Sequence, residues 1–273
     1  MFIRVVVSLF VLSSILFSNE IVLNKIENII GKDDYQLHQN LIKILYKDEN
    51  RYIINGKLKY YNIFYQLKQN GLLKLKFNTP KDITISFKSI NSSKNGYKIL
   101  NDTLHSLGYR YYLTKRLDIF EENSFLWDIK FKTEYMLDPL FLLKELQQKN
   151  CKITNVENQA SNHWYYEIDF KDAILSEATK IEKNEKVSFK KPLGEYFLMV
   201  DDPKQLQVIS RKLNNWFPYI SFFDKELNLL KTIKKDRIYK GYKTKVPNGT
   251  KYIKITDLYN LINIKRGLSV IVK

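Results

Sequence analysis

Hydrophobic and polar residues alternate in three different ways along this chain, and each way predicts a different structure. Up to residue 50, apolar residues recur at the three- and four-residue spacing of amphipathic helices. The first helix ends at Gly31, and Asp33 and Asp34 can cap the second. We expect a helical hairpin over residues 19–50, which either packs against the next domain or forms a docking arm. The apolar positions are Val22, Ile26, Ile29 and Ile30 in the first helix and Leu37, Leu41, Ile44 and Leu45 in the second.

Residues 51–170 mix helical spacing with the two-residue period of half-buried strands. From Ile83 to Phe170 the order is strand, helix, strand, strand, helix, strand, strand. This order is the split βαβ, or ferredoxin-like, arrangement with an extra edge strand. We expect two helices on one face of an antiparallel sheet, with Tyr109, Tyr111 and Leu113 on one face of the second strand.

The last part of the chain, residues 171–273, shows strand after strand and no helical period. Asn248 and Gly249 form a turn, because both residue types tolerate positive φ. Trp216 opens an apolar run that we expect inside a core. Short strands at this spacing indicate a sandwich or barrel. The predicted fold class is therefore α+β: an N-terminal helical hairpin, a ferredoxin-like α/β sandwich over 51–170 and an all-β C-terminal sandwich over 171–273.

Residues 1–18 have the pattern of a secretory signal peptide. Arg4 supplies a positive charge, and residues 5–17 are only apolar residues and serines. This run is shorter than the ~20 residues of a membrane-spanning helix. Because Leu16 is a poor residue next to a cleavage site after Ser18, an uncleaved inner-membrane anchor is the alternative. The pattern predicts a periplasmic protein.

The composition adds a strong positive charge to this picture. The chain has 45 basic and 29 acidic residues, a net charge of +16. Such a surface favours anionic partners, among them peptidoglycan or an anionic membrane surface, and export argues against nucleic acid. The alternative explanation is codon usage in an AT-rich genome, which enriches Lys, Ile, Asn and Tyr. With one cysteine, Cys151, no internal disulfide forms, so the core alone must hold the fold.

Catalytic and cofactor signatures are missing from the sequence. The three histidines, His38, His105 and His163, lie in different predicted elements without ligands at metal spacing, and Cys151 has no histidine near it. We find no Gly-rich phosphate loop and no nucleophile or metalloprotease motif. The prediction is no catalytic residue, no metal and no cofactor, with an unrecognised hydrolase as the alternative to a non-enzymatic protein.

Tyrosines beside basic residues give the one candidate binding surface. If they lie on strands, outward Tyr side chains among Lys and Arg are typical of interfaces or of surfaces that stack on sugars. Ordinary strand propensity is the alternative explanation. The candidate residues are Arg110, Tyr112, Lys115, Arg116 and Tyr165.

Two segments carry a loose resemblance to a known group of proteins. Residues 140–146 (LFLLKEL) lead to residues 163–170 (HWYYEIDF), and with the signal pattern and the Lys/Ile/Asn/Tyr bias they resemble the uncharacterised exported proteins of Campylobacter-type bacteria. The resemblance implies a periplasmic setting, in which such bacteria build envelope and flagellar-motor scaffolding. It transfers no functional residue.

The sequence therefore favours a non-enzymatic periplasmic protein that binds other envelope proteins and helps assemble or anchor an envelope structure, such as a flagellar-motor scaffold. The alternative is a glycan- or peptidoglycan-binding protein that acts through its C-terminal sandwich.

Overall fold

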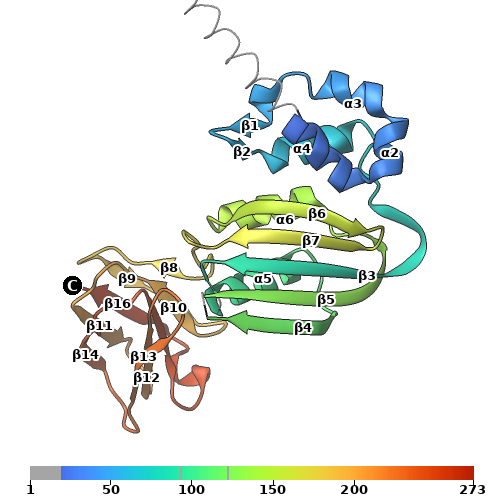
Figure 1. The fold of residues 1–273 in the computed structure, drawn as a ribbon. Helices are drawn as coiled ribbons and strands as arrows, with labels where there is room; N and C mark the ends of the chain where they lie inside the picture. Colours follow the sequence, from blue (N-terminus) through green and yellow to red (C-terminus); the bar gives the residue numbers. More distant parts are fainter. Residues whose placement is uncertain (1–19, 93, 122) are drawn as a thin grey trace, which may run out of the picture. The chain divides into compact units, whose positions relative to one another are not determined.

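The computed structural model describes residues 20–92, 94–121 and 123–273, and these fall into two compact units (Figure 1). Unit 1 is Met1–Ile174 and unit 2 is Leu175–Lys273. The predicted signal segment, residues 1–18, lies outside the described residues. Within the described part, no helix combines the length and the apolar character that crossing a membrane requires.

Unit 1 begins with a layer of short helices. Residues 20–30 are helical, and a small hairpin separates the third short helix from the fourth. The elements are α2 (Lys32–Leu37), α3 (Gln39–Leu45), the 3-10 turn η1 (Glu49–Arg51), β1 (Ile53–Ile54), β2 (Lys57–Leu58) and α4 (Tyr60–Gln69).

The second helix of the predicted hairpin is in fact two helices, because the chain breaks at His38. The break turns the expected apolar face away from the protein. Leu37, Leu41 and Ile44 are exposed, whereas Tyr35 and Ile42 are buried in their place. The prediction of one continuous helix over these residues was wrong, and the expected face with Leu37 and Ile44 is not packed against the next domain.

A five-stranded sheet follows the helical layer, and two helices, α5 and α6, cover one of its faces (Figure 1). The strands lie in the order β4-β5-β3-β7-β6. The elements are β3 (Lys76–Ile90), α5 (Lys94–Ser106), β4 (Leu113–Phe120), β5 (Ser124–Tyr135), α6 (Pro139–Gln148), β6 (Lys152–Ala160) and β7 (His163–Asp169).

The sheet differs from the prediction in the place of its last strand. β7 lies between β3 and β6 instead of at the edge, and it runs parallel to β3. The sheet is therefore mixed and not antiparallel throughout. Alternation along β7 predicts which side chains are buried, but it contains no information on the neighbouring strands.

Aromatic rings fill the space between this sheet and its helices. Phe87 from β3 lies 6.0 Å from Trp127 of β5 and 5.8 Å from Tyr166 of β7, measured between ring centroids. All three rings are almost completely buried. α6 begins after an N-cap aspartate and a proline: the Asp138 side chain accepts a hydrogen bond from the Leu140 N–H at 2.9 Å.

The two edges of the sheet are treated differently. The helical layer covers β6: the Tyr60 hydroxyl donates to the Thr154 carbonyl at 3.3 Å, and the Asn158 amide donates to the Ile29 carbonyl at 3.2 Å. At the other edge, β4 pairs only with β5 among the described strands. One edge is therefore protected within unit 1, and the other is left with unpaired backbone groups.

Unit 2 consists of two sheets that share one hydrophobic core. Trp216 is fully buried in this core, as predicted, and its indole N–H donates to the Thr256 carbonyl at 2.9 Å. One sheet has the order β13-β12-β15-β10-β8 and the other β14-β11-β16-β9. The strands are β8 (Thr179–Lys180), β9 (Lys186–Ser188), β10 (Tyr196–Met199), β11 (Gln205–Ser210), β12 (Pro218–Phe223), β13 (Leu229–Lys234), β14 (Gly241–Lys245), β15 (Tyr252–Asp257) and β16 (Leu268–Val272), with the 3-10 turn η2 (Leu261–Ile264) before β16.

Gly267, between η2 and β16, tests how tightly unit 2 is packed. Its φ is +87°, and an added Cβ would clash with the Phe189 carbonyl oxygen. We expect Gly267→Ala to lower the free energy of unfolding by about 3 kcal/mol or more, because strain and overlap add. Gly249 is the control, since its φ is +78° and nothing lies within 4 Å of an added Cβ. Gly249→Ala should cost roughly 1 kcal/mol in urea denaturation. Equal losses would contradict the packing described for Gly267.

Candidate functional site

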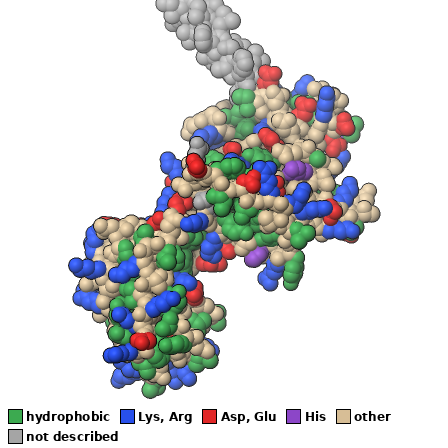
Figure 2. Space-filling model, turned by 60° about the horizontal axis from the view of Figure 1, so that its bottom comes forward, with side chains coloured by type: hydrophobic (Ala, Val, Ile, Leu, Met, Phe, Trp, Pro, Cys, Tyr) green, Lys and Arg blue, Asp and Glu red, His purple; other side chains and the backbone are tan. Residues whose placement is uncertain are grey.

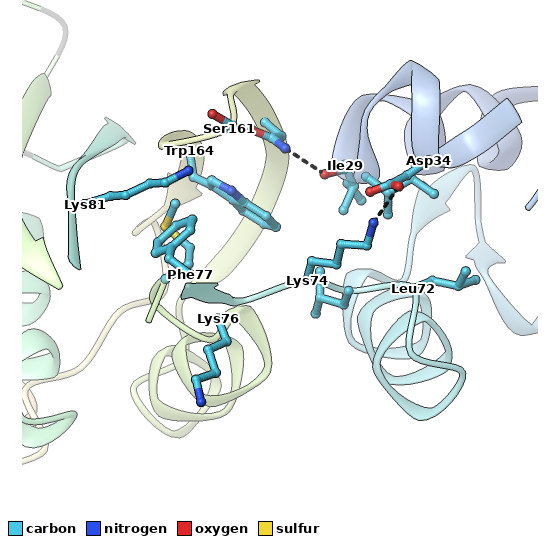
Figure 3. A pocket seen from close by; sticks show the side chains of 13 residues that line it. Ile29, Asp34, Leu72, Lys74, Lys76, Phe77, Lys81, Ser161 and Trp164 are labelled. Carbon is cyan, nitrogen blue, oxygen red and sulfur yellow. Dashed lines mark hydrogen bonds and ion pairs between the residues drawn. The ribbon is translucent and has the colours of Figure 1, made fainter. Parts of the chain in front are cut away.

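A pocket of about 260 Å³ lies between the helical layer and the sheet of unit 1 (Figure 3). Trp164 and Phe77 form its wall on the sheet side, and Ile29 and Leu72 line it on the helical side. This volume is below the ~300–1,000 Å³ of typical small-molecule sites. The pocket is therefore a small gap between two packed layers.

The charged groups around this pocket already have partners within the protein. The Lys74 ammonium is 2.7 Å from an Asp34 carboxylate oxygen, as Figure 3 shows. Lys81 lies 5.3 Å from the centre of the Phe77 ring, and Lys76 lies 5.7 Å from that of Tyr135. These contacts stabilise the junction of the layers and offer a ligand little free charge.

The exposed edge strand β4 is the stronger candidate. Leu113, Leu117 and Ile119 project from it into solvent. Lys115 and Arg116 lie between them, at a point where the pairing of β4 with β5 shifts by one residue. The strand thus combines unpaired backbone groups, large aliphatic side chains and positive charge, which are the features that a partner strand can use.

The structure places two of the predicted binding residues at the start of this strand. Arg110 and Tyr112 line an open depression of about 550 Å³, together with Tyr111 and Lys132. Tyr112, however, is turned inward: its hydroxyl donates to Asn101 Oδ1 at 2.5 Å. The neighbouring Tyr111 is the outward ring, 92% exposed.

The prediction of a strand with Tyr109, Tyr111 and Leu113 on one face and Tyr112 pointing outward was therefore wrong. Residues 109–112 are not part of the strand, which begins only at Leu113. The alternation assumed for a strand does not apply before that point, so the faces are exchanged.

The other three predicted residues lie on the sheet face opposite the helices. Arg116 opposes Asp128, Asp128 opposes Ser86, and Ser86 opposes Tyr165, so one row crosses four strands. Arg116 pairs with Asp118 at 2.5 Å. Tyr165 is half-buried, and burial, followed by the carboxylates of Glu167 and Glu157, raises the pKa of its hydroxyl to about 12. Arg116 and Tyr165 thus lie in the same row of the sheet, but two strands, β5 and β3, lie between them.

The sequence reasoning missed Leu117 and Ile119. Their alternation with Arg116 and Asp118 could have indicated a strand with one apolar face. Nothing in the pattern shows that this face would be left in solvent at an edge, because burial depends on what the fold places beside the strand.

His163 is a titratable residue on the sheet face opposite the helices, and it has a polar neighbour there. Its Nε2 lies 2.8 Å from the Ser86 hydroxyl oxygen. Burial lowers the pKa of His163, Asp128 acts against that shift and Lys115 adds to it. The imidazole is therefore mostly neutral at pH 7. In the described residues, no group of three His, Cys, Asp or Glu side chains is arranged to hold a metal ion.

Cys151, the single cysteine, is buried, and burial raises the pKa of its thiol to about 12. The thiolate is the reactive form, so we expect no reaction with a thiol reagent such as DTNB at pH 8 in the folded protein. Unfolding in urea should release one equivalent of thiol. Rapid reaction of the native protein would show that Cys151 is accessible and ionised.

No protein-family model matches the chain, and no curated protein matches it. A solved structure described as the crystal structure of accessory secretory protein 1, 2 and 3 in Streptococcus pneumoniae is similar over 36% of this chain and 86% of that chain. The identity is 12% and the TM-score 0.20, values too low to support a conclusion on fold or function.

Proposed function

We propose that this protein is a non-enzymatic periplasmic protein that binds other proteins and helps assemble or anchor an envelope structure. The observation that carries the proposal is the exposed strand β4. It offers a partner eight residues of edge backbone with aliphatic side chains beside them. A soluble protein usually protects such an edge, because it can pair with any extended chain.

Charge narrows the kind of partner. Arg110, Lys115 and Lys132 lie at or beside β4, so a strand that combines apolar and acidic residues fits best. Backbone hydrogen bonds would give affinity, and the side chains at alternate positions would give specificity.

The proposal includes a finer description of the fold. We regard the sheet of unit 1 as a ferredoxin-like arrangement with one strand inserted. β3, β5 and β4 keep the neighbours of that plan, and β7 separates β3 from β6. We infer export from residues 1–18 of the sequence, which have the pattern of a signal peptide.

Ile119 provides the direct test. Ile119→Lys places a charge on the edge strand, and we expect at least a tenfold loss of envelope proteins captured from a periplasmic extract, because a buried lysine opposes strand addition. Ile44→Lys is the matched control, since Ile44 on α3 is 72% exposed and Ile119 is 70% exposed. Capture lost equally in both variants, or in neither, would contradict binding through β4.

The four-stranded sheet of unit 2 supports a second candidate, binding to peptidoglycan. Its strands β9, β11, β14 and β16 contain no Asp or Glu. Lys243 opposes Gln207, Gln207 opposes Ile271, and Ile271 opposes Lys186, which makes a row of outward side chains across the sheet. The two lysines at the ends of this row carry positive charge and the glutamine can form hydrogen bonds, so the row suits an acidic polysaccharide.

Sedimentation with purified peptidoglycan tests this candidate. We expect Lys186→Glu/Lys243→Glu to reduce the sedimented fraction about tenfold at low salt, because like charges replace attraction. Lys231→Glu/Lys234→Glu, on the other sheet, changes the net charge equally and should sediment like the wild type. No sedimentation of the wild type at low salt would exclude this candidate.

A further inference from the structure

Three loops lie together at one end of unit 2, and the segment before β12 joins them. They are residues 211–217, 235–240 and 258–267. The Asn215 N–H donates to the Asn263 carbonyl at 2.9 Å, and the Tyr239 N–H donates to the Trp216 carbonyl, also at 2.9 Å. We call this end of the unit the loop platform.

Two buried polar side chains fix the platform. The Asp257 carboxylate accepts hydrogen bonds from the backbone N–H groups of Phe217 at 2.8 Å and of Tyr259 and Asn260 at 3.0 Å. The Asn214 side chain donates to the Gly267 carbonyl at 2.8 Å. These side-chain bonds join loops 211–217 and 258–267, and the backbone bond of Tyr239 attaches loop 235–240. The platform is therefore a defined surface rather than a set of mobile loops.

Large apolar side chains project from this surface. Leu213 is 77% exposed, Tyr259 65% and Ile262 66%, and Ile238 is half exposed. None of them belongs to the buried core of unit 2. An apolar group of this size at one end of a domain is typical of an interaction surface.

Leu213 is the most unusual residue of the group. Its φ is +69°, in the left-handed region that favours glycine and asparagine. Among the described non-glycine residues with positive φ, five are Asn and one is Asp, and Leu213 and Leu227 are the exceptions. Leu227 is partly buried, whereas Leu213 combines strain with exposure. Such strain at an exposed side chain suggests that another molecule uses it.

Basic residues surround the apolar group. The exposed ones on the platform loops are Arg211, Lys212, Arg237, Lys240, Lys265 and Arg266, whereas Asp236 is the exposed acidic residue there. At the opposite end of the unit the charges are mixed, because the loops there contain the acidic residues Asp201, Asp202, Asp224 and Glu226 and the basic residues Lys204, Lys225 and Lys251. Figure 2 shows how widely Lys and Arg are spread over the visible face of unit 2.

We propose that the loop platform docks on the surface of a lipid bilayer that contains anionic phospholipids. Leu213, Ile238 and Ile262 would enter the boundary between headgroups and acyl chains, and Tyr259 would remain at the interface, where its ring and hydroxyl both find partners. The basic side chains would contact the phosphates. Charge complementarity selects the bilayer over an apolar protein groove, in which six surrounding cations would have to be desolvated or paired.

This inference goes beyond the proposed function, because the platform belongs to unit 2 and β4 to unit 1. Loss of one activity therefore leaves the other measurable: a Leu213 variant should still capture its partner proteins, and Ile119→Lys should still bind vesicles.

The test is co-sedimentation of the chain lacking residues 1–18 with vesicles of phosphatidylethanolamine and phosphatidylglycerol. Leu213→Asn is the key variant, because asparagine accepts the positive φ and should keep or raise the melting temperature. We expect its vesicle affinity to fall about tenfold, the value of one buried leucine side chain. Lys212→Glu/Lys265→Glu should lose binding to the same degree or more.

Two controls separate docking by the platform from simple charge attraction. Lys183→Glu/Lys225→Glu changes the net charge equally, at the end of unit 2 away from the platform, and should bind vesicles like the wild type. Vesicles of phosphatidylcholine alone should bind the wild type at least tenfold more weakly. Wild-type affinity in Leu213→Asn, an equal loss in the Lys183/Lys225 control, or no binding to anionic vesicles would each overturn the proposal.

Discussion

The parallel pairing of β3 with β7 is the constraint on which the arrangement of unit 1 depends. Thr84 opposes His163, and the register continues to Ile90 opposite Asp169. A strand that follows α6 and β6 could have ended at the edge, but this pairing brings it inside the sheet. β6 is thereby displaced to the edge. All the differences between the two edges follow from that displacement.

The displaced edge explains why the chain needs its helical layer. β6 would otherwise present unpaired backbone groups, and the layer supplies polar contacts to it, among them a bond of 2.7 Å from the Lys25 ammonium to Asn155 Oδ1. Phe64 of α4 also packs against Trp164 of β7, with ring centroids 6.1 Å apart. Nothing comparable covers β4 within the described residues. The fold protects one edge and leaves the other available, which is the asymmetry that a binding strand requires.

The sequence predicts the helices and strands better than it predicts which strands lie side by side in a sheet. The two-residue period along β7 matches the alternation of its buried and partly buried side chains, and Trp216 lies inside the core as expected, because both signals are local. The place of β7 beside β3 is a long-range choice that no local period encodes. The prediction for Leu37 and Ile44 was wrong for another reason. Their spacing fits one helix, but the helix is interrupted at His38, between the two residues.

The candidate surface shows the same limit. Composition selected Arg110, Lys115 and Arg116, which lie at or near the exposed edge, but Tyr112 is turned inward because the strand begins one residue after it. Apolar residues at Leu117 and Ile119 suggest burial when they are considered along the chain alone. They indicate a binding edge only when the fold shows that, among the described strands, β4 has β5 on one side and no strand on the other.

In the loop platform, one residue has a side chain that suits neither its backbone angle nor its exposure. In most of unit 2, side-chain type, backbone angle and burial agree, as they do for Asn184, which takes a φ of +65°. At Leu213 they disagree, since an exposed leucine holds a backbone angle that suits asparagine. The buried Asp257 carboxylate, 6% exposed, organises the adjoining loops. Burying the Asp257 carboxylate costs free energy, and the apolar side chains that it helps to hold in solvent add no stability to the fold. We therefore infer that these side chains contact another molecule or a membrane. The ring of basic residues makes an anionic bilayer the surface that satisfies both kinds of side chain together.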